Sequence, residues 1–236
     1  MTELLYHTDS YMREFTAVVV DVQGQDVRLD RTAFYPGGGG QPADAGELGW
    51  EGGGSRLVGM RKDAGGLWHT VEGTPPPAGA SLQGRLDWER RYPLMRTHTA
   101  MHILCGVIFR QYGASVTGGQ MEPLRGRMDF EFASMHQDLV REIEGLINRE
   151  VEAARPVRAR SLPRAEAFQI PDLIRTKINL LPPGIPEVRV VEIEGLDLQA
   201  DGGTHVANTR EVGPLKIVDY KSKGAINKRL VVALEP

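Results

Sequence analysis

The amino-acid sequence predicts an α+β fold: a small N-terminal β-barrel domain followed by a two-layer α+β domain with helices on a mainly antiparallel sheet. Short strand patterns separated by Gly- and Pro-rich turns fill the N-terminal part, which favours a barrel or sandwich over βαβ units. A helical pattern begins near Tyr92, and strands and helices then mix without regular alternation. Such mixing is typical of helices packed on an antiparallel sheet. We expect the domains to span residues 1–90 and 91–236.

The strands of the expected barrel start with residues 15–22 and 26–29, which flank Gly24 and therefore predict a hairpin. Further strand candidates are residues 56–61, 67–71 and 81–86. Turns rich in Gly or Pro separate them, including three consecutive prolines at residues 75–77.

A run of four glycines, residues 37–40, has the most unusual local composition in the chain. Glycine loses more conformational entropy on ordering than any other residue, so the run needs a reason. One interpretation is a flexible linker. The other is a loop whose backbone approaches a ligand or another backbone closely, and the flanking Phe34, Tyr35 and Pro36 favour it. The spacing of a nucleotide-binding P-loop is missing.

The second domain is expected to begin with a helix from Leu94 to Tyr112, with Pro93 in its first turn and Gly113 as a stop signal. Ser134 starts a capping-box pattern ahead of a second, amphipathic helix. The remaining expected elements are strands at residues 127–132, 157–162, 187–193, 215–220 and 228–234, and a helix at residues 164–176 that Pro171 interrupts.

Composition and charge narrow the class of protein. Cys105 is the single cysteine, so no intramolecular disulfide is possible and a reducing compartment fits best. The apolar runs are far shorter than the roughly 20 residues that a membrane span needs, and the N-terminus lacks the pattern of a signal peptide. We therefore expect a cytoplasmic protein that has no membrane-spanning segment. The net charge of -3 and the pI near 6.1 argue against a generic nucleic-acid coat but leave room for a local basic patch.

Two pairs of side chains with the same spacing indicate a metal site. His98 and His102 stand four residues apart and share one face of the expected helix. That spacing is common in helices that bind nothing, but Asp201 and His205 repeat it in a glycine-rich segment. Together the pairs offer three imidazoles and one carboxylate, all of which are zinc ligands. Cys105 lies about 10 Å from His98 along a straight helix, so a buried thiol is the better interpretation.

Several motifs resemble the editing domain of alanyl-tRNA synthetases and their free-standing AlaX relatives. They are residues 96–102 (RTHTAMH), 202–205 (GGTH), 208–214 (NTREVGP) and 221–224 (KSKG). Residues 30–41, with Phe34-Tyr35-Pro36 and the glycines before Gln41, resemble a motif in the N-terminal domain of the longer AlaX proteins. The resemblance covers nearly the whole chain, and 236 residues leave no room for an aminoacylation domain, so it implies the free-standing form.

The resemblance implies a trans-editing hydrolase that removes a wrongly attached amino acid, chiefly serine and secondly glycine, from alanine tRNA. It also implies that zinc is held by His98, His102 and the segment with His205, and that mischarged alanine tRNA is the partner. The sequence indicates no membrane association, and no protein partner is evident from it. The family pattern in the second metal motif is Cys-x-x-x-His, whereas this chain has Asp201 at the cysteine position. Asp201 then ligates the metal directly, acts through a water, or marks the loss of the metal, in that order of preference.

The residues leave two mechanisms for ester hydrolysis open. A metal would either lower the pKa of a bound water towards about 7, which is the preferred source of the nucleophile, or anchor the α-amino group of the substrate while another water attacks. No protein side chain is assigned as the catalytic group.

Recognition of serine requires a positioned polar group, because an apolar pocket does not reward one hydroxyl. Thr117 is the first candidate for that contact and Thr99 is the second. The alternative for each is an ordinary capping or surface threonine that contacts no substrate. Gln41, with Gly39 and Gly40, is expected to reach the substrate from the glycine-rich loop.

A basic C-terminal stretch supplies the candidates for RNA contact, Lys221, Lys223 and Arg210. The alternative is a solvated strand edge that carries lysines. Two functions compete with editing: an RNA-binding module that has lost the metal, and a metal hydrolase that acts on a different ester or amide.

Overall fold

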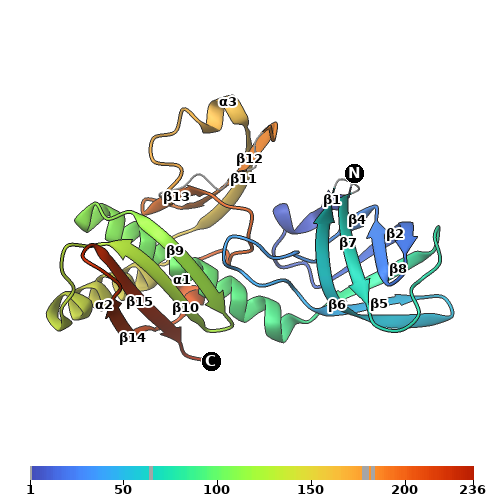
Figure 1. Cartoon of the computed structure of the whole chain (residues 1–236), viewed down its shortest axis with the longest axis horizontal. Coiled ribbons are helices and arrows are strands. Elements are labelled where there is room, and N and C mark those ends of the chain that lie inside the picture. The colour runs from blue at the N-terminus through green and yellow to red at the C-terminus, as the bar shows by residue number, and fades with distance from the viewer. Residues whose placement is uncertain (1, 64–65, 177–180, 182–183) are drawn as a thin grey trace. The chain divides into compact units, whose positions relative to one another are not determined.

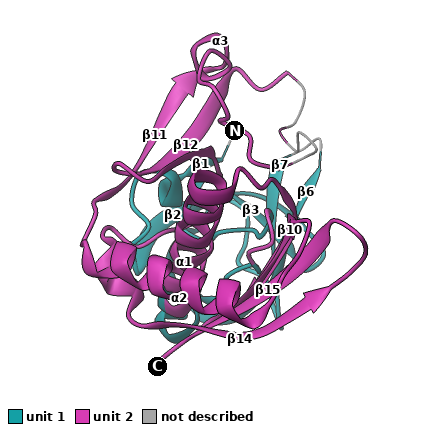
Figure 2. Ribbon diagram, turned by 90° about the vertical axis from the view of Figure 1, so that its left-hand side faces the viewer, with its two compact units in different colours: residues 1–38, 42–92 teal, residues 39–41, 93–236 magenta. Residues whose placement is uncertain are grey.

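The computed structural model describes residues 2–63, 66–176, 181 and 184–236. The chain forms two compact units, shown in different colours in Figure 2. Unit 1 contains residues 1–38 and 42–92, and unit 2 contains residues 39–41 and 93–236. The tip of the glycine-rich loop therefore groups with unit 2, whereas both flanks of the loop belong to unit 1.

Unit 1 is built around a closed antiparallel barrel, as the sequence predicts (Figure 1). Around the barrel the strands are β2 (Glu14–Gln23), β3 (Asp26–Leu29), β7 (Gly66–Val71), β6 (Gly53–Asp63), β5 (Gly46–Trp50) and β8 (Ser81–Leu86). Buried and exposed residues alternate along β2 and β8, so one face of each strand fills the barrel. Phe15, Val19, Leu48 and Leu82 belong to this core.

The expected hairpin is confirmed, because β2 pairs with β3 and Gly24 has a φ of 60° in the turn. Sequence reasoning missed β5, in which two glycines interrupt the apolar alternation. It also missed the short parallel pair formed by β1 (Glu3–Leu4) and β4 (Arg31–Thr32). The 3₁₀ helix η1 (Leu5–His7) comes directly after β1.

Helix α1 (Trp88–Tyr112) begins earlier than the expected start at Leu94. The carbonyl of Asp87 accepts from the N–H of Arg91 at 2.9 Å, and its side chain accepts from the N–H of Arg90 at 3.2 Å. Asp87 therefore caps the helix, and Pro93 lies inside it rather than in its first turn. From Pro93 onwards α1 belongs to unit 2, where most of its side chains are buried.

The larger sheet of unit 2 has the order β14 (Leu215–Ser222), β15 (Asn227–Leu234), β10 (Arg125–Glu131) and β9 (Val116–Glu122), all antiparallel. Helix α1 lies directly against it, because a Cβ on Gly126 of β10 would come within 2.5 Å of Met101 Sδ. The expected strands at 127–132, 215–220 and 228–234 are confirmed, whereas β9 was not expected. Helices on an antiparallel sheet confirm the predicted α+β class.

Helix α2 (Gln137–Glu152) packs against β14 of the same sheet. Its buried side chains are Val140, Ile143, Ile147 and Val151. Asn148 exchanges two side-chain hydrogen bonds with the backbone of Leu215 in β14. The prediction that Ser134 caps this helix is wrong. His136 is the cap, and its Nδ1 accepts from the N–H of Leu139 at 3.3 Å, because the helix starts two residues later than the Ser134 pattern requires.

A second sheet in unit 2 consists of β11 (Val157–Pro163), β12 (Glu187–Ile193) and β13 (Asp197–Ala200), again antiparallel. The helix expected at 164–176 is wrong in extent, because α3 (Arg164–Ala167) ends before Pro171. Asp172 has a φ of 55°, which no right-handed helix allows. The 3₁₀ helix η2 (Thr209–Val212) follows, with Asn208 and Glu211 forming a capping box. Among the described helices, none has the length and apolar character to traverse a lipid bilayer.

Candidate metal centre

His98 and His102 stand one turn apart on the buried part of α1. Their side chains are 4% and 7% exposed, and their ring centroids lie 5.2 Å apart. Two imidazoles that share one helix face inside the core are costly unless polar partners or a metal satisfy them. The helix thus presents both rings to one point, as the four-residue spacing predicts.

Asp201 and His205 lie in the segment between β13 and η2. Arg189 of β12 holds this segment, because its Nη1 donates to the carbonyls of Asp201 and Gly203 at 3.0 and 2.9 Å. The N–H of Gly203 in turn donates to Asp201 Oδ1 at 2.6 Å. The backbone therefore turns the carboxylate of Asp201 and the ring of His205 towards α1.

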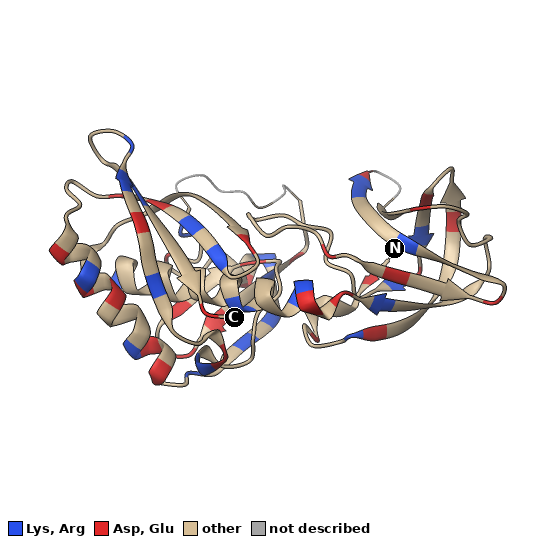
Figure 3. Ribbon diagram, turned by 90° about the horizontal axis from the view of Figure 1, so that it is seen from below, with Lys and Arg blue, Asp and Glu red and all other residues tan. Residues whose placement is uncertain are grey.

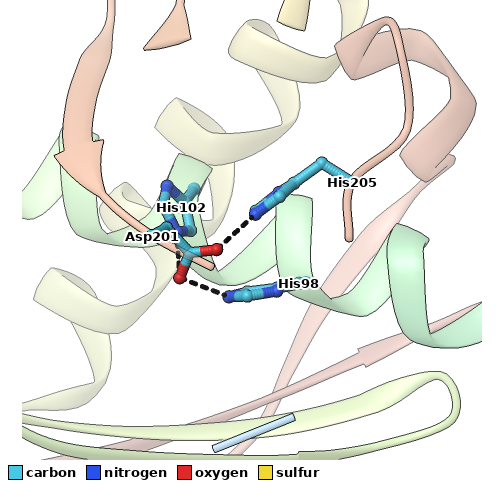
Figure 4. A group of neighbouring side chains, drawn as sticks. All are labelled: His98, His102, Asp201 and His205. Atoms are coloured by element: carbon cyan, nitrogen blue, oxygen red, sulfur yellow. Dashed lines mark hydrogen bonds and ion pairs between the residues drawn. The ribbon is translucent and has the colours of Figure 1, made fainter. Parts of the chain in front are cut away.

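The four side chains converge (Figure 4). Asp201 Oδ2 lies 3.4 Å from His98 Nε2 and 3.9 Å from His102 Nε2, and Asp201 Oδ1 lies 3.2 Å from His205 Nε2. One ligand atom from each residue lies within 4.8 Å of every other. Tetrahedral zinc with ligands at about 2.0–2.1 Å needs donors about 3.3 Å apart, so the set of donors fits such an ion.

The glycine-rich loop supplies the partner of His98. Nδ1 of His98 donates to Gln41 Oε1 at 2.9 Å, and the backbone N–H of Thr204 donates to the same oxygen at 3.1 Å. The Nε2 of Gln41 donates to Thr204 Oγ1 at 2.8 Å. Because Nδ1 of His98 is taken by Gln41, Nε2 is the ring nitrogen that faces Asp201.

The other two histidines are tied in the same way. Nδ1 of His102 donates to Asp197 Oδ2 at 3.1 Å, and Nδ1 of His205 lies 3.2 Å from Thr99 Oγ1. Each ring therefore uses Nδ1 for an outer partner and turns Nε2 to the centre. This arrangement is typical of histidines that ligate metals.

The charges of the group shift its pKa values in opposite directions. Burial favours a raised pKa for Asp201, but attraction to His98 and hydrogen bonds from the three histidines hold it well below its usual value. Burial and the nearby charge of His98 lower the pKa of His205 well below its usual range. Burial also disfavours protonated His102, yet hydrogen bonds to Asp197 and Asp201 raise its pKa to about 9. A metal that binds at neutral pH must therefore displace a proton from this cluster.

The four glycines of the loop serve close approach rather than flexibility. Gly37, Gly38, Gly39 and Gly40 have φ values of 86°, 137°, 57° and 89°, which favour glycine. The carbonyl of Gly40 accepts from the N–H of Met121 in β9 at 3.0 Å. A Cβ on Gly40 would come within 3.0 Å of the carbonyl oxygen of Gly119. The loop tip therefore pairs with the end of β9 in unit 2.

Thr117 does not join the cluster. It lies exposed on β9, where its Oγ1 donates to Asn227 Oδ1 at 2.9 Å. Gly118 pairs with Asp129 and Val116 with Phe130, so Thr117 is the additional residue of a β-bulge. Of the two threonines expected to contact substrate, only Thr99 is buried at the centre.

The three residues expected to contact RNA are exposed. Lys221 lies on β14, at the edge of its sheet, and pairs with Asp219 at 3.0 Å. Lys223 follows β14, and Arg210 lies in η2. Another lysine of this stretch, Lys228, is buried and donates to two backbone carbonyls.

Cys105 is buried, as expected, and burial raises the pKa of its thiol far above its usual value. Asp197 and Thr204 are the partners that sequence reasoning missed. The signal for Asp197 was present, because residues 197, 201 and 205 repeat a four-residue interval of Asp, Asp and His.

A family model described as the second additional domain of threonyl and alanyl tRNA synthetases matches residues 188–231. This stretch begins within β12, contains Asp201 and His205, and reaches into β15. The match defines the class of protein, a chain that carries the second additional domain of these synthetases.

Comparison over the full length is more specific. The alanyl-tRNA editing protein AlaX-M of Saccharolobus solfataricus is 39% identical over 241 residues, covering 100% of both chains. AlaX-M of Methanosarcina barkeri is also 39% identical, covering 99% of both chains. The alanine–tRNA ligase of Pyrobaculum neutrophilum is 42% identical over 224 residues, which are 92% of this chain and 25% of the ligase. The chain belongs to the AlaX-M family of alanyl-tRNA editing proteins, which confirms the resemblance seen in its motifs.

Proposed function

We propose that the protein is a trans-editing hydrolase that deacylates mischarged Ser-tRNA(Ala), with Gly-tRNA(Ala) as a second substrate, at a zinc site. The observation that carries the proposal is the convergence of three buried histidines and one carboxylate in a member of the AlaX-M family. The mischarged tRNA is the partner, and the cytoplasm is the expected location.

We propose that His98, His102, Asp201 and His205 hold the metal, with Asp201 as a direct ligand in the position of the family's cysteine. Their convergence within 4.8 Å and the outward ties of all three Nδ1 atoms support this ligand set. A bound zinc ion would supply Lewis acidity, either to lower the pKa of water or to hold the α-amino group of the substrate.

Residues of the chain itself prepare the site. Gln41 fixes the orientation of His98 and the backbone of Thr204 through one oxygen. Thr99 accepts from the N–H of Val206 at 3.2 Å and faces His205. We propose that Gln41 and Thr99, with the backbone of Gly39 and Gly40, also shape the pocket for the serine hydroxyl.

The role of Thr117 as the contact for the serine hydroxyl stays a prediction. Its hydrogen bond to Asn227 would have to break before Thr117 could bind that hydroxyl.

We propose that tRNA phosphates are contacted by Lys221, Lys223 and Arg210, and the exposure of these side chains supports the proposal. Figure 3 shows Lys and Arg interspersed with Asp and Glu along the ribbon, so contact would depend on these local cations rather than on net charge. We further propose that residues 91–236 form the editing domain and residues 1–90 an accessory barrel domain.

The decisive experiment measures the release of serine from Ser-tRNA(Ala), with Ala-tRNA(Ala) as the substrate control, together with the metal content of the purified protein. Wild type should contain about one zinc ion per chain and release serine selectively. His98→Ala should abolish activity. His136→Ala is the matched control, because His136 is exposed and caps α2 outside the cluster.

Three outcomes would contradict the proposal in different ways. Tight tRNA binding without metal or deacylation would identify an RNA-binding module. Metal with activity only on unrelated esters or amides would identify a different hydrolase. An unaffected rate in His98→Ala would mean that the site lies elsewhere.

The role of Asp201 is tested by comparing wild type with Asp201→Cys in the same assay. A carboxylate is a harder ligand than a thiolate, so wild type should prefer zinc over the softer cadmium more strongly, and accept cobalt or manganese more readily, than the variant. Identical metal preferences would show that Asp201 does not touch the ion.

A further inference from the structure

Asp197 is a buried carboxylate behind the candidate metal centre. It is the first residue of β13, and its side chain is 0% exposed. Its Oδ2 accepts from His102 Nδ1 at 3.1 Å and from Gln199 Nε2 at 2.6 Å. It does not belong to the group of atoms that converge on a metal position, so its contacts call for a separate explanation.

The other carboxylate oxygen of Asp197, Oδ1, faces a cation. Nε of Arg175 lies 3.5 Å from Asp197 Oδ1, and the guanidinium of Arg175 stacks 3.7 Å from the ring centroid of Phe109. A buried carboxylate without a cation is strongly unfavourable, and Arg175 offsets that cost. Within the described residues the Arg175 contact is an ion pair without a hydrogen bond, so Oδ2 remains aligned on His102 and Gln199.

The backbone of this part of unit 2 is arranged to bring Asp197 close to α1. Gly106 lies one turn after His102, and a Cβ there would come within 3.0 Å of Asp197 Cβ and of Leu196 Cγ. Any larger residue at 106 would push the start of β13 away from the helix. Close packing of this kind fixes the position of the carboxylate against the imidazole.

The outer partners of the three histidines differ in charge. His98 is tied to the neutral amide of Gln41 and His205 to the neutral hydroxyl of Thr99. His102 differs, because the partner of its Nδ1 among the described residues is a carboxylate, that of Asp197. A carboxylate that accepts from Nδ1 orients the ring and makes Nε2 a stronger electron donor.

We propose that Asp197 is a positioning residue of the metal centre, which holds His102 with its proton on Nδ1 and strengthens Nε2 as a ligand. The inference rests on the proposed function of the His98 group as a metal site. The ion that His102 would bind is the zinc ion of the proposed function. Arg175 and Gln199 in turn hold Asp197 in place.

The test compares wild type with Asp197→Asn and Asp197→Ala by two readouts that do not depend on activity. One is the Kd for Zn²⁺, measured by competition with a chromophoric chelator. The other is the visible absorption spectrum of the Co²⁺-loaded protein. Asp197→Ala should weaken zinc binding about 10–100-fold and change the cobalt spectrum. Asp197→Asn keeps an acceptor oxygen without the charge, so it should recover part of the affinity.

Asp129→Asn is the matched control. Asp129 is also a buried aspartate in unit 2, but it forms hydrogen bonds with Arg229 at 2.6 and 2.8 Å and none with a metal-centre histidine. It should lose stability and keep the wild-type Kd and cobalt spectrum. If Asp197→Asn and Asp197→Ala bind zinc as tightly as wild type, the inference is overturned while the metal site stands. If wild type binds neither ion, the proposed function fails as well.

A second measurement covers the case in which the Asp197 variants do not fold. Nitrogen-15 NMR of histidine-labelled wild type reports which ring nitrogen carries the proton. His102 should have its proton on Nδ1 in the zinc-loaded protein. A proton on Nε2 would overturn the inference without any variant.

Discussion

Gly203 illustrates how little free space surrounds the metal-centre side chains. A Cβ on Gly203 would come within 2.4 Å of His98 Cε1 and 2.7 Å of Gln41 Oε1. These are the two side chains whose hydrogen bond orients the ring of His98. The glycine is thus required by its neighbours rather than by its own backbone angles, which lie outside the left-handed region.

Gly203→Ala should therefore disrupt the candidate metal centre. The added methyl group must displace His98 or Gln41, so zinc affinity should fall by at least about tenfold, with about 1–3 kcal/mol lost in the free energy of unfolding. Chelator competition and urea unfolding measure the two effects. Gly202→Ala is the control, since a Cβ there meets no atom within 4 Å. Equal zinc affinity in both variants would contradict the packing argument.

At the scale of elements, the base of the glycine-rich loop is held by the start of α1. Asp44 accepts from the N–H of Tyr35 at 2.7 Å, and its own N–H donates to the carbonyl of Tyr35 at 3.0 Å. Nε of Arg91 donates to Asp44 at 3.0 Å, and its Nη2 donates to the carbonyl of Ala33 at 2.6 Å. Both side chains are almost completely buried, so one ion pair ties the two flanks of the loop to a helix.

Arg91→Ala should destabilise the protein by about 3–5 kcal/mol, because it leaves the Asp44 carboxylate buried without its partner. Chemical unfolding monitored by tryptophan fluorescence measures the loss. Arg85→Ala offers a matched control: Arg85 pairs with Glu47 at 2.6 Å, but both side chains are more than half exposed. That change should cost far less stability than Arg91→Ala, because solvent screens the exposed pair. Similar losses in the two variants would argue against a special role for the buried pair.

The elements also show what the sequence alone could predict. Local signals sufficed for the β2–β3 hairpin, where Gly24 marks the turn, and for the amphipathic helix α2. They failed at the start of α1, where Asp87 gives a cap signal before Trp88 but Pro93 suggested a later beginning. They also failed for β5 and β9, whose glycines break the strand pattern and whose pairing depends on distant strands.

The candidate metal centre could be predicted where its residues lie close together in the sequence. The interval of four residues identified His98 with His102 and Asp201 with His205, and the structure brings the two pairs together. Asp197 was missed although it extends the interval of four residues, because its contact with His102 depends on the approach of β13 to α1. The direction of the Thr117 side chain depends on a β-bulge, which the sequence does not mark.

At the scale of the whole molecule, stability should depend on pH through a histidine that lies outside the metal centre. His69 is buried in the barrel unit, and its ring contacts the carbonyl of Val27 at 3.2 Å and Thr32 Oγ1 at 2.9 Å. Burial lowers its pKa from 6.5 to about 4, against the opposing effect of the Val27 hydrogen bond. The folded protein therefore keeps His69 neutral where the unfolded chain would protonate it.

The contribution of neutral His69 to stability is fully present above about pH 6.5 and is lost as the pH falls from there towards about 4. The full loss corresponds to about 3 kcal/mol. Urea unfolding at a series of pH values between 8 and about 4 measures it. His69→Gln cannot titrate and should show a flatter dependence, even if it is less stable at every pH. An equal slope in both proteins would assign the pH dependence to other groups.

The carboxylate of Asp201 also changes how the protein should respond to oxidation. A thiolate ligand is a target for peroxide and for alkylating reagents, and its oxidation releases the metal. Here a carboxylate takes that position, and the single thiol of the chain, Cys105, is buried. Zinc content and deacylation should therefore survive hydrogen peroxide or N-ethylmaleimide at doses that inactivate Asp201→Cys. Editing by this protein would then continue under oxidising conditions in which a cysteine-ligated site loses its zinc.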